Sequence, residues 1–126
     1  MVNLLRPKVV KTTGFSNKAR LQHILDAICE IENYIRNIII KKFSGSSEKK
    51  YASVKQLEII GEVAGKMTGE TKSRHPEVEW TKIIALRNIL VHDYYVIDEN
   101  VVWNIITEDL PELKEQIVSL LKSFVE

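Results

Sequence analysis

Cysteine, long apolar runs and strand-like alternation are all scarce in this chain. Cys29 is the only cysteine among 126 residues, which excludes an internal disulfide and a cysteine-rich metal site and is typical of a reducing compartment such as the cytoplasm. No window approaches the run of about 18 apolar residues that a membrane span requires, and residues 1–8 lack the apolar stretch of a secretory signal. The sequence therefore predicts a cytoplasmic protein that does not enter a membrane.

Charge of the two signs is nearly balanced, so the chain as a whole has no strong attraction to a polyanion. The 18 basic and 17 acidic side chains give a net charge of +1, and any polyanion contact must come from a local patch. Residues 1–20 carry five basic side chains and no acid, whereas residues 98–126 carry seven acids against two lysines. Arg6, Lys8 and Lys11 are therefore candidates for polyanion contacts, and a surface tail without that role is the alternative.

The length and apolar content predict a single domain. With 44% hydrophobic residues, 126 residues can form one core and are too few for two. We expect a basic N-terminal extension over residues 1–15 and one helical domain over residues 16–126. The helical spacing of apolar residues favours an all-α bundle of four or five helices joined by short connections.

The first expected helix has a broad apolar stripe. Ser16 or Asn17 is a candidate cap for its start, and the helix is predicted to run to Lys41 or Lys42. Its apolar residues recur at intervals of three and four, as Leu21, Ile24, Leu25, Ile28, Ile31, Ile35, Ile38 and Ile39.

Small and polar residues over 44–50 predict a loop, and a second helix is expected from about Tyr51. Gly61, Gly65 and Gly69 each lower helix stability by roughly 1 kcal/mol relative to alanine. Small residues there could instead allow a close contact with another helix.

A third helix is expected to start near Pro76, which suits a first helical turn. Asp98 and Asp109 resemble two further helix caps. Asp109 with Glu112 three residues later has the pattern of a capping box ahead of a last amphipathic helix.

The third helix is predicted to carry the residues with the most chemistry, Arg87 to Tyr94, in the order Arg, four residues, His, one residue, Tyr. On an ideal helix Arg87 lies on an apolar arc between Ile83 and Val91, whereas His92 is about 140° away. One straight helix cannot bring Arg87 and His92 over one small group, so either the helix ends before Tyr94 or a second surface completes the site.

An apolar setting would make an unpaired guanidinium costly, which favours a partly desolvated cleft or a subunit interface around Arg87. We infer a self-associating protein with its site at the seam. The plainer alternatives are an arginine that extends to solvent, a histidine bonded on a helix surface, and a pair of tyrosines, Tyr94 and Tyr95, that fix the helix end to the core.

Other residues give weaker indications. His23 and His75 have no companion ligands at a recognisable spacing, so no metal site is predicted. The segment from Gly61 to Lys66 lacks a complete phosphate-loop pattern, so this chain is not expected to bind a nucleotide cofactor. Trp80 and Trp103 lie among apolar neighbours and are expected to pack in the core.

Five blocks of the sequence, in order, resemble the HepT-like branch (DUF86) of the HEPN superfamily. They are Arg20-Leu21-Gln22-His23-Ile24-Leu25-Asp26-Ala27-Ile28, Leu57-Glu58-Ile59-Ile60-Gly61-Glu62, Trp80, Arg87-Asn88-Ile89-Leu90-Val91-His92-Asp93-Tyr94, and Val102-Trp103 before Asp109-Leu110-Pro111. The resemblance implies a homodimeric HEPN bundle with the active cleft at the subunit interface. It also implies a metal-independent endoribonuclease toxin of a type VII toxin-antitoxin pair. The expected antitoxin is a minimal nucleotidyltransferase of the MntA type, which uses ATP to transfer AMP to Tyr94. Residues 1 to about 15 precede the family's usual first helix.

The residue types agree with that implied chemistry. RNA cleavage without a metal needs a base for the ribose 2′-hydroxyl, an acid for the leaving 5′-oxygen and positive charge at the phosphorus. His92 and Arg87 can supply these functions, because an imidazole exchanges protons near neutral pH and a guanidinium binds phosphate oxygens in pairs. The second proton carrier could be the other subunit's histidine, Tyr94 or water. Asn88 can orient the imidazole, bind phosphate, or be a surface amide.

AMP on Tyr94 would block RNA by its bulk and negative charge, and Arg6, Lys8 and Lys11 could contact the RNA backbone. The main alternative is a noncatalytic HEPN module that binds, or presents substrate to, a nucleotidyltransferase. A third reading is a plain dimerising helical bundle.

Overall fold

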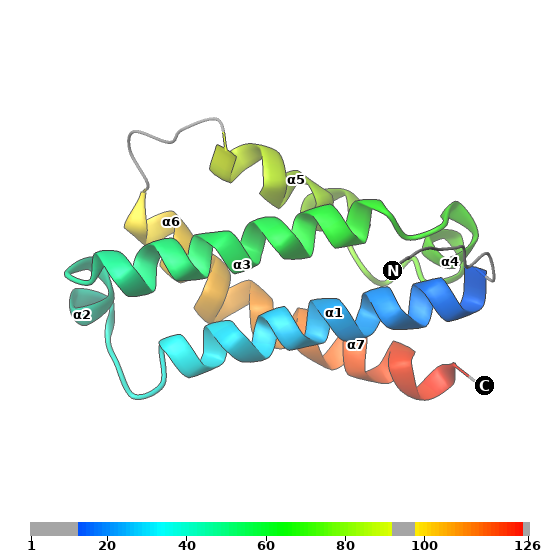
Figure 1. The fold of residues 1–126 in the computed structure, drawn as a ribbon, viewed down its shortest axis with the longest axis horizontal. Helices are drawn as coiled ribbons and strands as arrows, with labels where there is room; N and C mark the ends of the chain where they lie inside the picture. The colour runs from blue at the N-terminus through cyan, green and yellow to red at the C-terminus, as the bar shows by residue number, and fades with distance from the viewer. Residues whose placement is uncertain (1–12, 92–97, 125–126) are drawn as a thin grey trace, which may run out of the picture.

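A computed structural model describes residues 13–91 and 98–124, and every regular element in these residues is helical (Figure 1). The expected all-α class is confirmed. The structure has more helical segments than the four or five predicted, because two short helices join the longer ones. The segments are α1 (Thr13–Tyr34), α2 (Ile40–Ser44), α3 (Ser47–Gly65), α4 (Gly69–Arg74), α5 (Trp80–Val91), and a last contiguous segment made of α6 (Glu99–Asn104), the π-helical turn η1 (Ile105–Asp109) and α7 (Leu110–Ser123).

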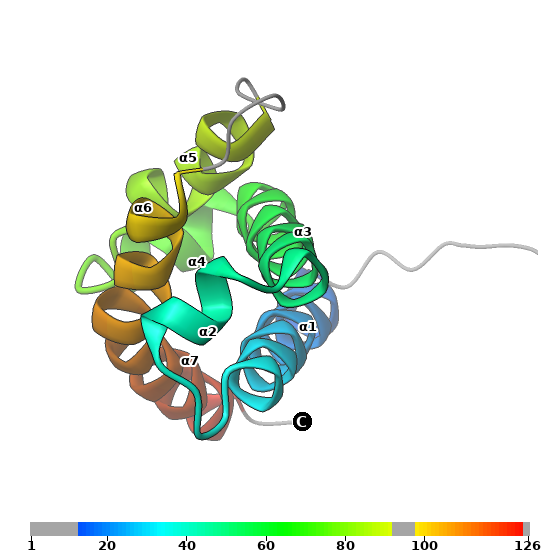
Figure 2. The same ribbon diagram turned by 90° about the vertical axis from the view of Figure 1, so that its left-hand side faces the viewer.

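The long helices surround one apolar core. α3 packs against α1 on one side and α5 on the other, while α7 packs against α1. Figure 2 looks onto the end of the bundle where α2 lies across the core, beside the starts of α3 and α6. We call this the α2 end. Fully buried side chains from three helices form the centre of the core, namely Leu21, Ile24, Ile28 and Ile31 of α1, Leu57 and Ile60 of α3, and Ile117 of α7. No helix in the described ranges combines the length and apolarity needed to cross a bilayer.

The first helix is shorter than its apolar pattern predicts. α1 ends at Tyr34 rather than at Lys41 or Lys42, and the chain turns through Asn37, which has a left-handed φ of 62°. Asparagine tolerates that region better than most residues. The turn sends the chain into α2, where Phe43 is fully buried and lies 5.2 Å from the Trp103 ring, measured between centroids.

The second helix begins earlier than predicted. Ser46 is its cap, with the Ser46 hydroxyl accepting a hydrogen bond from the Lys49 amide at 3.1 Å. The expected loop over 44–50 and the start near Tyr51 were therefore wrong, because Ser47 to Lys50 are already helical. The cap satisfies an amide that has no partner within the first helical turn.

The third long helix begins later than predicted. α5 starts at Trp80, not near Pro76. A proline disfavours helical geometry in the residue before it, and His75 has the non-helical angles φ −128° and ψ 65° at the end of α4. Trp80 is buried as expected, and its indole nitrogen donates to the His75 carbonyl at 3.0 Å.

Asn17 does not cap α1, because α1 already begins at Thr13. Asn17 is 2% exposed and joins α1 to α4 instead. Its amide donates to the hydroxyls of Thr68 at 2.9 Å and Thr71 at 2.7 Å, and its carbonyl accepts from the Thr68 amide at 3.2 Å. Thr68 in turn caps α4 by accepting from the Thr71 amide.

The two predicted aspartate caps differ. Asp98 caps α6, accepting from the amides of Asn100 and Val101. Asp109 makes no side-chain cap bond and has helical angles, since the chain passes from α6 through η1 into α7 without a break. The capping-box prediction with Glu112 was therefore wrong.

Two ion pairs between helices join segments far apart in sequence. Lys50 at the start of α3 lies 3.1 Å from Glu99 at the start of α6. Lys114 of α7 lies 2.9 Å from Glu32 of α1, and its hydrogen bond to this carboxylate raises the pKa of Lys114. The first pair fixes the start of α6 to α3 at the α2 end.

Candidate functional site

The position of Arg87 depends on a glycine in the neighbouring helix. A Cβ placed on Gly61 of α3 would stand 2.8 Å from the Arg87 amide nitrogen, 3.0 Å from the Ile83 carbonyl oxygen and 3.3 Å from the Arg87 Cβ. The backbones of α3 and α5 therefore touch at the turn that carries Arg87. The expected close contact through small residues is confirmed at Gly61, and Gly69 lies outside α3 at the start of α4.

The Arg87 side chain is exposed in the single chain. Among the described residues it has no hydrogen-bond acceptor and no carboxylate within ion-pair distance. A partly desolvated cleft around Arg87 is therefore not formed by these residues alone, and a subunit interface stays a prediction. An exposed and unpaired guanidinium can bind an incoming phosphate without first breaking an internal ion pair.

The other predicted site residues fall outside what the structure describes. His92 and Tyr94 lie in the undescribed range 92–97, and Arg6, Lys8 and Lys11 lie in residues 1–12. Asn88 belongs to α5 by its backbone, and its side chain is not described. Their roles stay predictions.

The ends of the described chain on either side of residues 92–97 can be placed. α5 ends at Val91, and the chain resumes at Asp98, the cap of α6. The Lys50–Glu99 ion pair holds the start of α6 against the start of α3. After residues 92–97 the chain therefore resumes at the α2 end (Figure 2).

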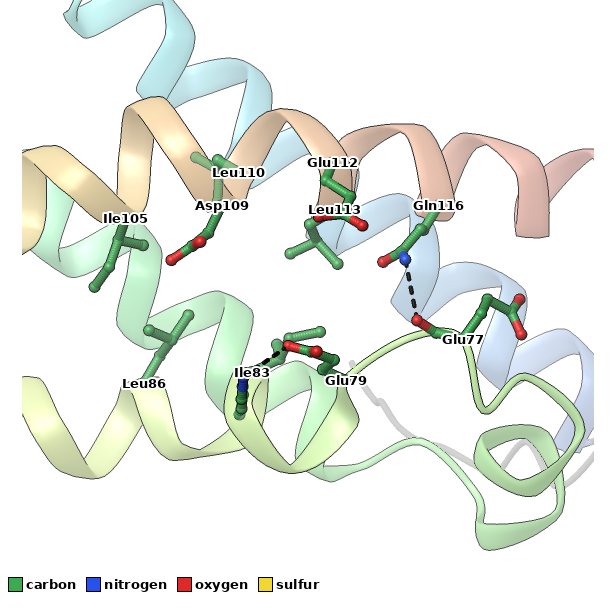
Figure 3. A pocket seen from close by; sticks show the side chains of 11 residues that line it. Glu77, Glu79, Ile83, Leu86, Ile105, Asp109, Leu110, Glu112, Leu113 and Gln116 are labelled. Atoms are coloured by element: carbon green, nitrogen blue, oxygen red, sulfur yellow. Dashed lines mark hydrogen bonds and ion pairs between the residues drawn. The ribbon is translucent and has the colours of Figure 1, made fainter.

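A cavity of about 190 Å³ lies elsewhere, between the first half of α5 and the segment η1–α7. Figure 3 shows carboxylates of Glu79, Asp109 and Glu112 directed into the space between these helices. Its apolar wall includes Ile83 and Leu113. Glu77 also lines it. Among the described lining residues Lys82 alone is basic, and its ammonium already lies 3.3 Å from the Glu79 carboxylate. The excess of acids in residues 98–126 was the sequence signal for this cavity, which would repel a phosphate backbone.

The described histidines show no sign of a metal centre. Over residues 13–91 and 98–124 no group of three or more His, Cys, Asp or Glu side chains is placed to hold an ion. His75 lies 3.5 Å from Glu77, which is an ion pair only when the imidazole is protonated.

Comparison with known proteins gives a consistent result. The family model described as ribonuclease HepT-like matches residues 24–120. "Probable ribonuclease HepT" of Thermococcus cleftensis is 35% identical over 107 residues, which cover 85% of this chain and 97% of that protein. "Putative RNase MJ1380" of Methanocaldococcus jannaschii is 33% identical over 100 residues, covering 79% of this chain and 92% of that protein. No solved structure matches the chain at a significant level.

Proposed function

The chain belongs to the ribonuclease HepT-like family, and from this premise we propose that it is an endoribonuclease that cleaves RNA through Arg87 and His92 without a metal ion. The names of its relatives support a ribonuclease-type activity. The observation that carries the proposal is Arg87, an exposed cation without a partner among the described residues, on a helix fixed by backbone contact to α3.

In the proposed reaction the ribose 2′-oxygen attacks the adjacent phosphorus. A base removes the 2′-hydroxyl proton, the bond from phosphorus to the 5′-oxygen breaks, and an acid protonates the leaving oxygen. The products are a 2′,3′-cyclic phosphate and a 5′-hydroxyl. Arg87 stabilises the charge on the phosphorane-like transition state, and His92 carries one of the two protons. Asn88, one helical turn before His92, orients the imidazole or binds phosphate.

We further propose that the protein acts as a homodimer and as the toxin of a type VII pair. The second subunit covers the face of α5 that one chain leaves exposed and completes the cleft. A nucleotidyltransferase of the MntA type silences it by transferring AMP from ATP to Tyr94, which adds bulk and negative charge where an RNA phosphate must bind.

The alternative function is a noncatalytic HEPN module that binds or presents substrate to a nucleotidyltransferase. An exposed Arg87 is compatible with this role as well, because an arginine can bind the phosphates of a partner's nucleotide. The two functions differ in intrinsic RNA cleavage.

The test compares purified wild-type protein with Arg87→Ala and His92→Ala on total cellular RNA in the presence of a chelator. Arg74→Ala is the matched control, since Arg74 is also exposed and, among the described residues, its one ion pair is with Glu70 on its own helix. Mass spectrometry first establishes that Tyr94 is unmodified. We expect cleavage with 2′,3′-cyclic phosphate ends by wild type and Arg74→Ala, and a loss of at least a hundredfold in the other two.

Equal cleavage by wild type and His92→Ala would indicate a contaminating nuclease and sink the proposal. No cleavage by unmodified wild type, together with binding to a nucleotidyltransferase, would support the noncatalytic module. Sedimentation of wild type and Arg87→Ala checks that the loss of activity is not a loss of the dimer.

A further inference from the structure

Basic residues are concentrated at the α2 end. Residues 36–55 contain six basic side chains and one acid, Glu48, although the whole chain has a net charge of only +1. These residues cover the turn after α1, all of α2 and the first half of α3. Figure 2 shows these elements together on the face turned toward the viewer.

Most of this positive charge is accessible. Lys41, Lys42 and Lys55 are exposed and Lys49 is half-buried, and within the described part of the chain none of these four lies in an ion pair. Lys50 differs, because its side chain is 14% exposed and its charge is offset by Glu99 at 3.1 Å. Three exposed lysines are therefore free to contact an anion, while Lys50 has a structural role.

An exposed aromatic ring belongs to the same basic stretch of sequence. Tyr51 is 54% exposed, whereas Phe43 and Trp103 pack against each other. The Lys50 ammonium lies 5.8 Å from the centre of the Tyr51 ring. Lys55 follows one helical turn after Tyr51 and lies on the same side of α3. An exposed ring with an unpaired lysine on the same side of a helix is a combination that binds single-stranded nucleic acid.

α3 leads from the basic surface toward Arg87. A Cβ on Gly65 would meet Ile84 and one on Gly61 would meet Arg87, so α5 runs antiparallel to α3. Tyr51 is ten residues before Gly61, about 15 Å along α3. Glu58 and Glu62 follow Lys55 on the same side of α3, so the basic surface ends before the turn that packs against Arg87.

We propose that Lys41, Lys42, Tyr51 and Lys55 form the surface that holds single-stranded RNA beside the cleavage motif. The lysines contact phosphates and Tyr51 stacks on a base. The acidic cavity between α5 and α7 repels the same strand and favours its approach from the α2 end. This inference rests on the proposed ribonuclease function, because it names the surface that binds that enzyme's substrate.

The test measures RNA binding separately from cleavage. Full-length His92→Ala protein is titrated into a fluorescently labelled single-stranded RNA of about 15 nucleotides, within the usual site size for such surfaces, and anisotropy is followed at several salt concentrations. Two kinds of variant are made in this background. One is the triple variant Lys41→Gln, Lys42→Gln, Lys55→Gln, and the other is Tyr51→Ala beside Tyr51→Phe.

The matched control removes the same charge elsewhere, with Lys66→Gln, Lys72→Gln and Lys122→Gln combined. We expect the α2-end triple variant to bind at least tenfold more weakly and to lower the salt slope by about 2, given roughly 0.7 per phosphate contact on a single strand. The control triple should lose less than about threefold, because it changes only net charge. Tyr51→Ala should lose roughly five- to hundredfold, and Tyr51→Phe should bind like its parent.

The outcomes separate this inference from the proposed function. If wild type cleaves RNA but the α2-end variants bind like their parent, the inference is overturned and the ribonuclease stands. If wild type does not cleave but the α2-end variants lose RNA binding, the ribonuclease fails and the surface stands. Equal losses in the two triple variants would show a general charge effect and overturn the inference, as would the absence of RNA binding by the parent. Circular dichroism of each variant confirms that the helices are intact.

Discussion

Gly61 and Arg87 meet backbone to backbone. The space that a Cβ at Gly61 would need is taken by the Arg87 amide nitrogen, 2.8 Å away, and by the Ile83 carbonyl oxygen, 3.0 Å away. These are main-chain atoms, so no change of side-chain rotamer can make room. The separation of α3 and α5 at the candidate site is therefore set by the absence of a side chain at position 61.

We predict that Gly61→Ala separates α3 from α5 and displaces Arg87. Overpacking of this kind costs about 1 to 3 kcal/mol, less up to about 1 kcal/mol from the better helix propensity of alanine. The free energy of unfolding in urea should therefore fall by up to about 3 kcal/mol, and RNA cleavage should fall further than the folded fraction does.

Gly65→Ala is the control for this substitution. A Cβ at Gly65 would meet only the Ile84 Cγ2 at 3.8 Å, an ordinary contact, so stability and cleavage should stay near the wild-type values. If the two alanine variants behave alike, the backbone contact does not position Arg87.

Much of the fold could be predicted because it depends on local pattern. Apolar residues at helical spacing predicted the all-α class. Asp98 was recognisable as a cap because the two backbone amides that donate to its carboxylate lie only two and three residues later in the sequence. The small residues of α3 also indicated a close contact. The pattern could not predict that α5 would be the helix in contact with Gly61, because Arg87 and Gly61 meet only when the helices pack.

The errors have the same origin. The apolar spacing continues through Ile35 and Ile38, which pack partly against the core. The end of α1 and the turn at Asn37 could therefore not be predicted from this spacing. Ile39, counted in the stripe, is 66% exposed. Asn17 looked like a cap because the residues that bind it are more than fifty positions away. For the site, only Arg87 has a described side chain, so the geometry of the motif as a whole stays a prediction.

Asn17 should contribute strongly to stability. Its side chain is buried and makes three hydrogen bonds to α4, and removing it would leave the Thr68 amide without this acceptor. We predict that Asn17→Ala lowers the free energy of unfolding by about 1 to 3 kcal/mol and speeds hydrogen exchange at the Thr68 amide. Gln22→Ala on the same helix should cost less than about 0.5 kcal/mol, because its bond to Asp26 is exposed. Equal losses would show that the α1–α4 network is not what Asn17 contributes.

Two serines of the same helix should respond in opposite directions. Ser53 is fully buried and its hydroxyl has no hydrogen-bond partner among the residues that the structure describes, so Ser53→Ala removes a desolvated polar group and should raise the free energy of unfolding by about 1 kcal/mol. Ser46 caps α3, so Ser46→Ala should lower it by about 1 kcal/mol. Urea denaturation of both proteins checks the signs, and a destabilised Ser53→Ala would mean that this hydroxyl is satisfied in solution.

Asp98 and Asp109 resemble each other in sequence but should differ in effect. Asp98 accepts from two amides at the start of α6, so Asp98→Ala should lower the free energy of unfolding by about 0.5 to 2 kcal/mol. Asp98→Asn should retain most of the stability that the cap contributes, because asparagine is also a good cap.

Asp109 lies within a continuous helix, where its carboxylate faces an acidic cavity. Its removal loses no cap and relieves repulsion among four carboxylates, so Asp109→Ala should stay within about 0.5 kcal/mol of wild type. Thermal unfolding of the three variants provides the comparison. A loss in Asp109→Ala as large as in Asp98→Ala would mean that α7 does begin at a cap and that the π-helical turn does not persist in solution.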